Sequence, residues 1–371
     1  MKDALAEKLL AQVMSWNPDD VARERPLLQA MAAFKYDEYE QYSPGMRFVE
    51  SLARWLNQFQ PADRELAYRF VKERLIFCSA REMDHLVETA YPDYVRPILL
   101  ERIASETGLN RRHVGRVAAS SAFRIGQRQC LFLGLSDGAR IDAFRRANRD
   151  LNHEQIWQTH ELSPERAAKL LEKLEEHVRE IDPDAQQAGP TRFRTIVLLD
   201  DFSASGSSYY AKKPDGSAGG KIATFLAGLM NQSGPLFQLK DPGGIELVIL
   251  IYMATERAMN HLEESLAPLV GGGISKIRVE TVQLVPEAIA IARGNPAEFG
   301  RLIESYYDHA IHDVHMQKGG TADSKFGYAD CGLPLVLHHN SPNNSIALLW
   351  SYDDRDVRGL FPRVQRHKEM S

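Results

Sequence analysis

The sequence predicts an α/β protein in which an all-helical region precedes a mostly parallel sheet, and two patterns lead to this prediction. Up to about residue 125, apolar residues recur at helical spacing, as in RFVESLARWLNQF and ELAYRFVKERLIF. Beyond that point, short apolar runs alternate with helical segments. Continuous apolar strands separated by helices are typical of a parallel sheet that is covered on both faces. We therefore expect a helical domain over residues 1–125 and an α/β domain over residues 126–371.

The expected strands follow one another with helices between them. They are QCLFLGL (129–135), RTIVLLD (194–200), ELVILIYMA (246–254) and IRVETVQLV (277–285). The last run alternates weakly between apolar and polar residues, which predicts a place nearer an edge of the sheet. A helix is expected with Ser163 as its N-cap and Pro164 at its first position. The Gly-rich, basic segment 211–221, AKKPDGSAGGK, is expected to be a mobile loop over a site.

Charge and cysteine content limit the setting of the protein. The 371 residues carry 45 Lys plus Arg and 50 Asp plus Glu, a formal charge of -5, so contact with nucleic acid would need a local basic patch. The 3 cysteines lie far apart without CxxC spacing, which argues against a disulfide framework and against a zinc site. The N-terminus has no apolar signal core, and the longest apolar run, residues 247–254, has the length of a strand. We expect a soluble cytoplasmic protein that does not enter the membrane.

The stretch IVLLDDFSASGSSY, residues 196–209, is the first candidate site. Its strand ends at Asp200 and Asp201, and in open α/β sheets ligands bind beyond the carboxyl ends of the strands. The small residues that follow let the backbone close around an anion, and their hydroxyls add donors. They are Ala204, Ser205, Gly206, Ser207 and Ser208. Two carboxylates beside such a phosphate cradle suit the vicinal hydroxyls of a sugar or a Mg²⁺ ion, and a phosphorylated ribose would satisfy both halves.

This order of four apolar residues, two acidic residues, a short spacer and Ser/Thr-Gly-x-Ser/Thr resembles the phosphoribosyl-pyrophosphate motif of type I phosphoribosyltransferases. The resemblance implies that Asp200 and Asp201 are the catalytic residues, that they face the ribose hydroxyls and hold Mg²⁺, and that residues 204–208 wrap the 5-phosphate. The alternative is that the two aspartates belong to another magnesium-dependent fold and that the serines only cap the next helix.

A second stretch, LFLGLSDGARIDAFRRAN (131–148), is a strand that ends in a tight turn. Ser136, Asp137 and Gly138 stand where the family's enzymes carry the loop that grips pyrophosphate. Any one of Arg140, Arg145 and Arg146 could neutralise it, and the other two would be charges on the helix surface. Gly138 would allow the unusual backbone of such a loop. The alternative is an ordinary strand-to-helix turn.

A third stretch, residues 326–350, places amides after the expected strand 333–337. The candidates are Asn340, Asn343 and Asn344. Their amides could read a base or a ribose at the open end of the sheet, or they could serve only as turn residues.

Together, the three stretches resemble the phosphoribosyltransferase-like proteins of bacterial conflict systems, including those found with retron reverse transcriptases in anti-phage defence. The resemblance covers roughly residues 129–350. It implies a Rossmann-like fold of the type I phosphoribosyltransferase kind, a defence role, and a phosphorylated ribosyl compound or nucleotide bound with Mg²⁺. An active site would make the protein a magnesium-dependent glycosyltransferase. The alternatives are a non-catalytic partner of a reverse transcriptase and its nucleic acid, and a ligand-sensing helix-turn-helix regulator; a homo-oligomer is compatible with each.

The helical half holds one more candidate. In LLERIASETGLNRRHVGRVAASS (99–121), the apolar, small and turn positions match a helix-turn-helix of the winged-helix kind. The outward residues of its second helix would suit phosphates and guanine edges. They are Asn110, Arg111, Arg112 and Arg116. The alternative is a structural module that makes only protein contacts.

Overall fold

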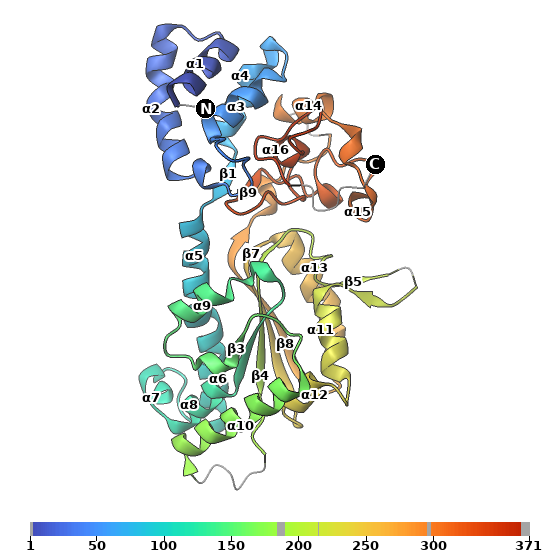
Figure 1. The fold of residues 1–371 in the computed structure, drawn as a ribbon. Helices are drawn as coiled ribbons and strands as arrows, with labels where there is room; N and C mark the ends of the chain where they lie inside the picture. The colour runs from blue at the N-terminus through green and yellow to red at the C-terminus, as the bar shows by residue number, and fades with distance from the viewer. Residues whose placement is uncertain (1–2, 184–189, 214, 295–297, 365–371) are drawn as a thin grey trace. The chain divides into compact units, whose positions relative to one another are not determined.

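The structure, a computed structural model, describes residues 3–183, 190–213, 215–294 and 298–364 (Figure 1). The chain forms two compact units. Unit 1 consists of Met1–Met83 and Glu287–Ser371, and unit 2 of Asp84–Pro286. Unit 2 carries both stretches that were predicted to bind a phosphorylated ribose.

Unit 2 is built on a five-stranded sheet with the order β3-β2-β4-β7-β8. Its strands are β2 (Cys130–Gly134), β3 (Ile156–Trp157), β4 (Thr195–Ser203), β7 (Ile245–Thr255) and β8 (Ile274–Val285). Every neighbouring pair is parallel, which confirms the predicted α/β class and is consistent with a Rossmann-like fold. The predicted edge position of the run 277–285 is also confirmed, because β8 is the last strand of the sheet.

Helices cover both faces of this sheet (Figure 1). They are α6 (Arg96–Thr107), α7 (Val114–Ala118), α8 (Ser121–Arg128), α9 (Ile141–Ala147), α10 (Pro164–Ile181), α11 (Lys221–Met230), α12 (Pro235–Leu239) and α13 (Glu256–Leu266). On one face, Ile196 and Leu198 of β4 share a core with residues of α10 to α13. On the other face, the ring of Phe132 lies 5.9 Å from that of Tyr91 and 5.1 Å from that of Phe144. As predicted, the side chain of Ser163 caps α10.

Unit 1 combines the N-terminal helices with the C-terminal part of the chain. Its helices are α1 (Asp3–Met14), α2 (Pro18–Phe34), α3 (Phe48–Asn57), α4 (Pro61–Glu73), α14 (Glu298–Ser305), α15 (Val314–Gln317) and α16 (Ala347–Trp350), while α5 (Ala80–Thr89) runs from unit 1 into unit 2. The rings of Phe70 and Phe299 stack at 3.8 Å, and the Trp55 Nε1 group donates to the Leu348 carbonyl at 2.8 Å. Because these two parts of the chain share one core, the units do not follow the expected division between residues 125 and 126.

A short strand pair in unit 1 differs from the sequence-based expectation. The end of the second predicted helical run forms β1 (Ile76–Cys78), which pairs in parallel with β9 (Leu335–Leu337). The strand expected at 333–337 therefore exists, but it belongs to a two-stranded sheet of unit 1 and not to the large sheet. Its partner lies more than two hundred residues away along the chain, a pairing that local sequence patterns do not reveal.

The winged-helix arrangement expected around residues 99–121 is not confirmed. Helix α6 ends at Gly108, which has a left-handed backbone as a C-cap, so the expected turn is present. The helix after the turn, α7, has only 5 residues, and α8 then leads directly into β2 of the sheet. In this part of the chain, all of it described, no pair of strands forms a wing.

Across the described ranges, no helix is both long enough and apolar enough to cross a membrane.

Candidate functional site

The two neighbouring strands β2 and β4 bring the first two predicted stretches together. Gly134 at the end of β2 is in register with Leu199 of β4, so the turn after β2 meets Asp200 and Asp201. The Ser136 hydroxyl donates a hydrogen bond to Asp200 Oδ1. The site is therefore assembled where the predicted strands end, as expected for an open α/β sheet.

The carboxylate of Asp200 is buried and fully engaged. Its side chain is 0% exposed, and the Lys221 ammonium lies 2.5 Å from Oδ2. Oδ1 accepts from Ser136 and from the Asp201 backbone N–H at 3.2 Å. Burial raises the pKa of the Asp200 carboxyl above its ordinary value, with a smaller contribution from the charge of Asp201, while Lys221 and Ser136 oppose the shift. Both oxygens thus have protein partners already.

Asp201 is only half-buried, and it packs against the turn after β2. Its Oδ1 accepts from the Phe202 backbone N–H at 2.8 Å. A Cβ atom added to Gly138 would lie 2.5 Å from Asp201 Oδ2, so glycine leaves room for this carboxylate. We expected Gly138 to supply an unusual backbone conformation, but its φ is not positive. In this turn the residue with a positive φ is Arg140, at 48°. Gly138 is needed for the close approach instead.

The small-residue loop 204–208 curls as a tight turn. Gly206 has a φ of 75°, and its carbonyl accepts from the backbone N–H groups of Tyr209 and Tyr210 at 3.0 and 3.1 Å. The Ser205 and Ser207 hydroxyls lie 2.8 Å apart. Among the residues that the structure describes, the backbone N–H groups of Ser205, Gly206 and Ser208 have no acceptor. Unused amides in a tight turn of small residues can bind an anion.

The chain does not pass directly from this loop into a helix. It forms a hairpin of β5 (Ala211–Lys212) and β6 (Ala218–Gly219), then returns at Lys221, which begins α11. The backbone N–H of Lys221 donates to the Ser208 carbonyl at 3.1 Å, so the loop lies at the N-terminus of α11 despite the insertion. The segment expected as a mobile loop is thus this hairpin, with position 214 outside the described residues.

Residues of α13 and of the end of β7 form hydrogen bonds with the loop and with the residues that follow it. They were not among the candidates that the sequence predicted. The Thr255 hydroxyl donates to the Ala204 carbonyl at 2.5 Å and also accepts from the Ala258 N–H as the N-cap of α13. His261 Nε2 lies 2.8 Å from the Tyr210 carbonyl. A threonine between the apolar run 246–254 and the helical segment after it is an N-cap signal, and it could have identified Thr255.

The other candidates near the loop are placed as follows. Asp137 and Gly138 lie in a short 3₁₀ turn, Asp137–Ala139. Arg140 pairs with Asp84 at 3.2 Å. This ion pair lies within unit 2, and it engages one of the three arginines that were considered for neutralising pyrophosphate.

The asparagines of the third stretch lie in unit 1, where they make local contacts. Asn344 Nδ2 donates to the Tyr328 carbonyl at 3.3 Å and to Cys331 Sγ at 3.4 Å. Asn343 Nδ2 donates to the sulfur of Met316 at 3.6 Å, and the Asn340 N–H donates to the Leu337 carbonyl at 3.0 Å.

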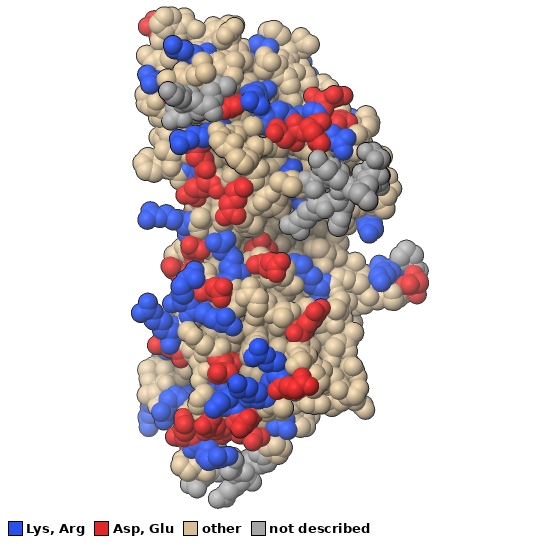
Figure 2. Space-filling view, viewed as in Figure 1, with Lys and Arg blue, Asp and Glu red and all other residues tan. Residues whose placement is uncertain are grey.

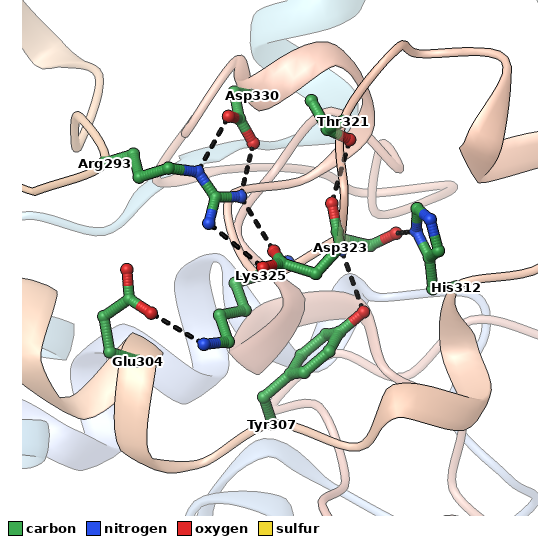
Figure 3. A network of polar contacts seen from close by, with 9 residues as sticks. Arg293, Glu304, Tyr307, His312, Thr321, Asp323, Lys325 and Asp330 are labelled. Atoms are coloured by element: carbon green, nitrogen blue, oxygen red, sulfur yellow. Dashed lines mark hydrogen bonds and ion pairs between the residues drawn. The ribbon is translucent and has the colours of Figure 1, made fainter.

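A polar network in unit 1 holds the segment before these asparagines (Figure 3). Arg293 donates to both Asp323 and Asp330, at 2.7 and 2.9 Å. Lys325 pairs with Glu304 at 2.7 Å. These carboxylates raise the pKa of Arg293 above its ordinary value, which is the sign of a structural cluster of ion pairs.

The residues expected to contact nucleic acid are split between a turn and a short helix. Asn110, Arg111 and Arg112 lie in the turn after α6, where the Asn110 side chain accepts from the Arg112 N–H at 3.0 Å. Only Arg116 lies on α7. They therefore do not form the outward face of one recognition helix, because the turn ends only at His113.

Metal binding at the loop would depend on Asp201. Within the described ranges, no group of three or more His, Cys, Asp and Glu side chains is placed to hold a metal ion. Mg²⁺ is commonly bound through one or two carboxylates together with the phosphates of a substrate. Asp201 fits that role as a single protein ligand, whereas both oxygens of Asp200 are already occupied.

A larger cavity lies at the opposite ends of the same strands. It has a volume of about 920 Å³ and is lined by residues at the starts of β4, β7 and β8 and by residues of α6. Several of its charges pair with one another, as Arg194 does with Glu106 at 2.7 Å and Arg278 with Glu246 at 2.7 Å. It shares no lining residue with the loop 204–208.

Comparison with known proteins places most of the chain in one family. The family PRTase-CE matches residues 52–363. No curated protein and no solved structure gives a significant match. The match spans both strands that carry the candidate site and the C-terminal part of unit 1. The chain therefore belongs to the PRTase-CE family and is a phosphoribosyltransferase-like protein.

Proposed function

We propose that the protein binds a phosphorylated ribosyl compound or nucleotide at the loop 204–208. One observation carries the proposal: the N–H groups of Ser205, Gly206 and Ser208 have no acceptor among the described residues, and their loop lies at the N-terminus of α11, close in sequence to the half-buried Asp201. The amides would bind the 5-phosphate, while Asp201 would accept from a ribose hydroxyl. Asp200 would position Asp201 and the turn at Ser136 from its buried place.

In the catalytic form of this proposal, a nucleophile forms a bond to the ribose C1 while the bond from C1 to the pyrophosphate oxygen breaks. The pyrophosphate leaves with the electron pair of that bond. A Mg²⁺ ion bound with the ligand would stabilise the charge of the leaving group. Asp201 would orient the ribose, and the loop 204–208 would hold the phosphate fixed during the displacement.

A binding role without catalysis is the second candidate, and one observation favours it. Asp200, one of the two expected ribose contacts, is 0% exposed and pairs with Lys221, so it does not face a ligand. In this form, the site would sense a nucleotide or dock a phosphate of nucleic acid. The resemblance to retron-associated proteins supports an anti-phage role in either form, with a reverse transcriptase and its nucleic acid as partners.

Calorimetric titration with phosphoribosyl pyrophosphate, with Mg²⁺ and with a chelator, tests the proposal. Ser208→Asp places a negative charge on the exposed side of the loop and is expected to abolish binding. Ala227→Asp, on the exposed side of α11, adds the same charge away from the loop and is expected to bind as the wild type does. Equal affinity in both variants would refute the assigned site. Release of pyrophosphate would then separate the catalytic form from the binding form.

A further inference from the structure

A small pocket of unit 2 lies beside the edge strand β3. It has a volume of about 300 Å³. We call it the Trp157 pocket; its polar and aromatic lining comes from Arg145, His153, Glu154, Trp157, Arg166 and Lys169. None of these residues belongs to the loop 204–208 or to the turn after β2, so the pocket is distinct from the site proposed above.

The indole of Trp157 forms a fixed wall of the pocket. Its Nε1 group donates to the Glu154 carbonyl at 2.8 Å, which sets the orientation of the ring. The Arg166 guanidinium lies 5.0 Å from the ring centroid, within the range of a cation–π contact. Lys169 follows Arg166 by three positions on α10, so both side chains lie on the same face of that helix.

Two cationic groups of the pocket have no anionic partner among the described residues. Arg145 is held by the Ile156 carbonyl and by Asp142 at 3.4 Å. By contrast, within the part of the chain that the structure describes, the side chains of Arg166 and Lys169 form no ion pair and no hydrogen bond. The lining holds one carboxylate, that of Glu154. The larger cavity of unit 2 differs, because Arg194 and Arg278 there are already paired with carboxylates.

A buried cation next to the pocket adds to its positive character. Arg128 is 5% exposed, and its Nη1 and Nη2 atoms have no hydrogen-bond partner among the described residues. Its Nε group donates to His177 Nδ1 at 3.1 Å, and that ring nitrogen also lies 3.1 Å from Nδ2 of Asn152, which precedes two lining residues. Burial lowers the pKa of Arg128 to about 10, and Glu154 opposes this shift. An uncompensated buried cation favours an anion nearby.

These groups gather on one part of a protein whose formal charge is -5. Figure 2 shows Lys and Arg side chains over the region of α9, β3 and α10 on the face in view, interspersed with acidic side chains. A concave basic surface that includes an aromatic ring is the combination by which proteins bind nucleotides, because the cations bind phosphate and the ring stacks on a base.

We propose that the Trp157 pocket binds one nucleotide unit. Lys169 and Arg145 bind its phosphate, and the stacked Trp157 and Arg166 side chains contact its base. The volume is at the lower end of the range of ligand sites, about 300–1,000 Å³, and suits a single unit. Such a unit comes either from a free nucleoside phosphate or from a strand of nucleic acid, whose other units would lie outside the pocket.

Fluorescence anisotropy with labelled single-stranded DNA and RNA of about 12 nucleotides tests this proposal. Arg166→Glu with Lys169→Glu is expected to weaken binding about tenfold or more, because it removes two cations of the pocket and adds two anions. Arg179→Glu with Lys212→Glu makes the same change of charge at exposed positions outside the pocket, and it is expected to leave the affinity within about twofold. All four substituted positions are exposed, so the fold is expected to be retained.

Two further comparisons identify the contact and the source of the nucleotide. Trp157→Leu is expected to weaken binding, whereas Trp157→Phe, which keeps an aromatic face, is expected to preserve most of it. Competition by adenosine monophosphate would assign the pocket to free nucleotides, and its failure to compete would assign it to a strand. The proposal is overturned if the wild type binds neither the two strand probes nor adenosine monophosphate, or if the two charge-reversed variants lose affinity equally. Ser208→Asp should leave this binding intact. The proposal for the Trp157 pocket can therefore be tested separately from the proposal for the loop 204–208.

Discussion

At the scale of single residues, the adjacent aspartates of the candidate site have different roles. Neighbouring residues of a strand point to opposite sides, so Asp200 is turned inward while Asp201 reaches the turn after β2. Asp200 is 0% exposed and is held by Lys221 and Ser136, whereas Asp201 is half-buried against Gly138. The sequence motif identified both aspartates, but it could not predict that only Asp200 is buried and paired. Its partner, Lys221, lies twenty-one residues further along the chain and reaches Asp200 only because the β5–β6 hairpin returns the chain to the loop.

Lys221→Met should therefore destabilise the protein in a pH-dependent way. Without its cation, the buried Asp200 carboxylate costs about 2 kcal/mol at neutral pH, a value reduced from that of a fully buried pair because Lys221 is partly exposed. Burial already raises the pKa of Asp200, and the substitution raises it further. A raised pKa of an acid favours the folded state at low pH, and this contribution is lost as the pH rises through the folded-state pKa. The loss should thus shrink toward about pH 4, the ordinary range of Asp.

Urea unfolding of the wild type and of this variant from acid to neutral pH measures the effect. Asp200→Asn combined with Lys221→Met removes the charge that lacks a partner, so the double variant should recover part of the lost free energy of unfolding. Lys212→Met, in the exposed hairpin strand, should be neutral. A loss that is the same at every pH would contradict the ion pair as its cause.

Gly138→Ala tests the close approach of the Asp201 carboxylate. The new methyl group would lie 2.5 Å from Oδ2, so the carboxylate must shift, at a cost of about 1–3 kcal/mol. Gly115→Ala is the matched control, because no atom lies within 4 Å of its added Cβ and the position is helical. It should be neutral or should stabilise the protein by about 0.5–1 kcal/mol. Thermal unfolding compares them, and similar behaviour of the two variants would show that the contact at Gly138 is unimportant.

At the scale of elements, continuous apolar runs and capping residues could be predicted well. Strands form at the apolar runs 129–135, 194–200, 246–254 and 277–285. The first three lie inside a sheet that helices cover on both faces, and the last lies at its edge. Pairing over long sequence distances could not be predicted. Ile76–Cys78 continues the helical pattern of its neighbours, and only its partner Leu335–Leu337 makes it a strand. The hairpin between the loop and α11 could not be predicted either, because its glycines and lysines are typical of an ordinary loop.

Thr255 links two elements, the helix α13 and the loop 204–208, through one hydroxyl. Thr255→Ala removes the N-cap and the hydrogen bond to the Ala204 carbonyl, and it should cost about 1–2 kcal/mol. Thr255→Ser keeps both bonds and should retain most of the stability. Hydrogen exchange should also become faster at the amides of residues 204–208 in the alanine variant, because their anchor is lost. If the serine variant is as unstable as the alanine variant, the methyl group and not the hydroxyl is responsible.

At the scale of the whole molecule, the chain leaves unit 1 within α5 and returns to it after β8. Unit 2 is therefore one continuous segment, and unit 1 is assembled from both ends. The sequence-based division at residue 125 separated helical from α/β patterns, but a compact unit is defined by its core and not by the type of its elements. The helical segment from α6 to α8 belongs with the sheet, and the core of unit 1 joins residues 6–77 with residues 291–361.

Fragments of the chain should fold according to these cores. Residues 84–286 contain the whole sheet and the helices of unit 2, so this fragment should fold cooperatively and bind phosphoribosyl pyrophosphate if the full chain does. Residues 126–371 lack the helices that cover Phe132 as well as half of the core of unit 1, so that fragment should be aggregated or unfolded. Circular dichroism, thermal unfolding and the dispersion of amide NMR signals distinguish the two. A well-folded 126–371 fragment beside an unfolded 84–286 fragment would contradict the assignment of the cores, because α5 to α8 would then be dispensable for the sheet.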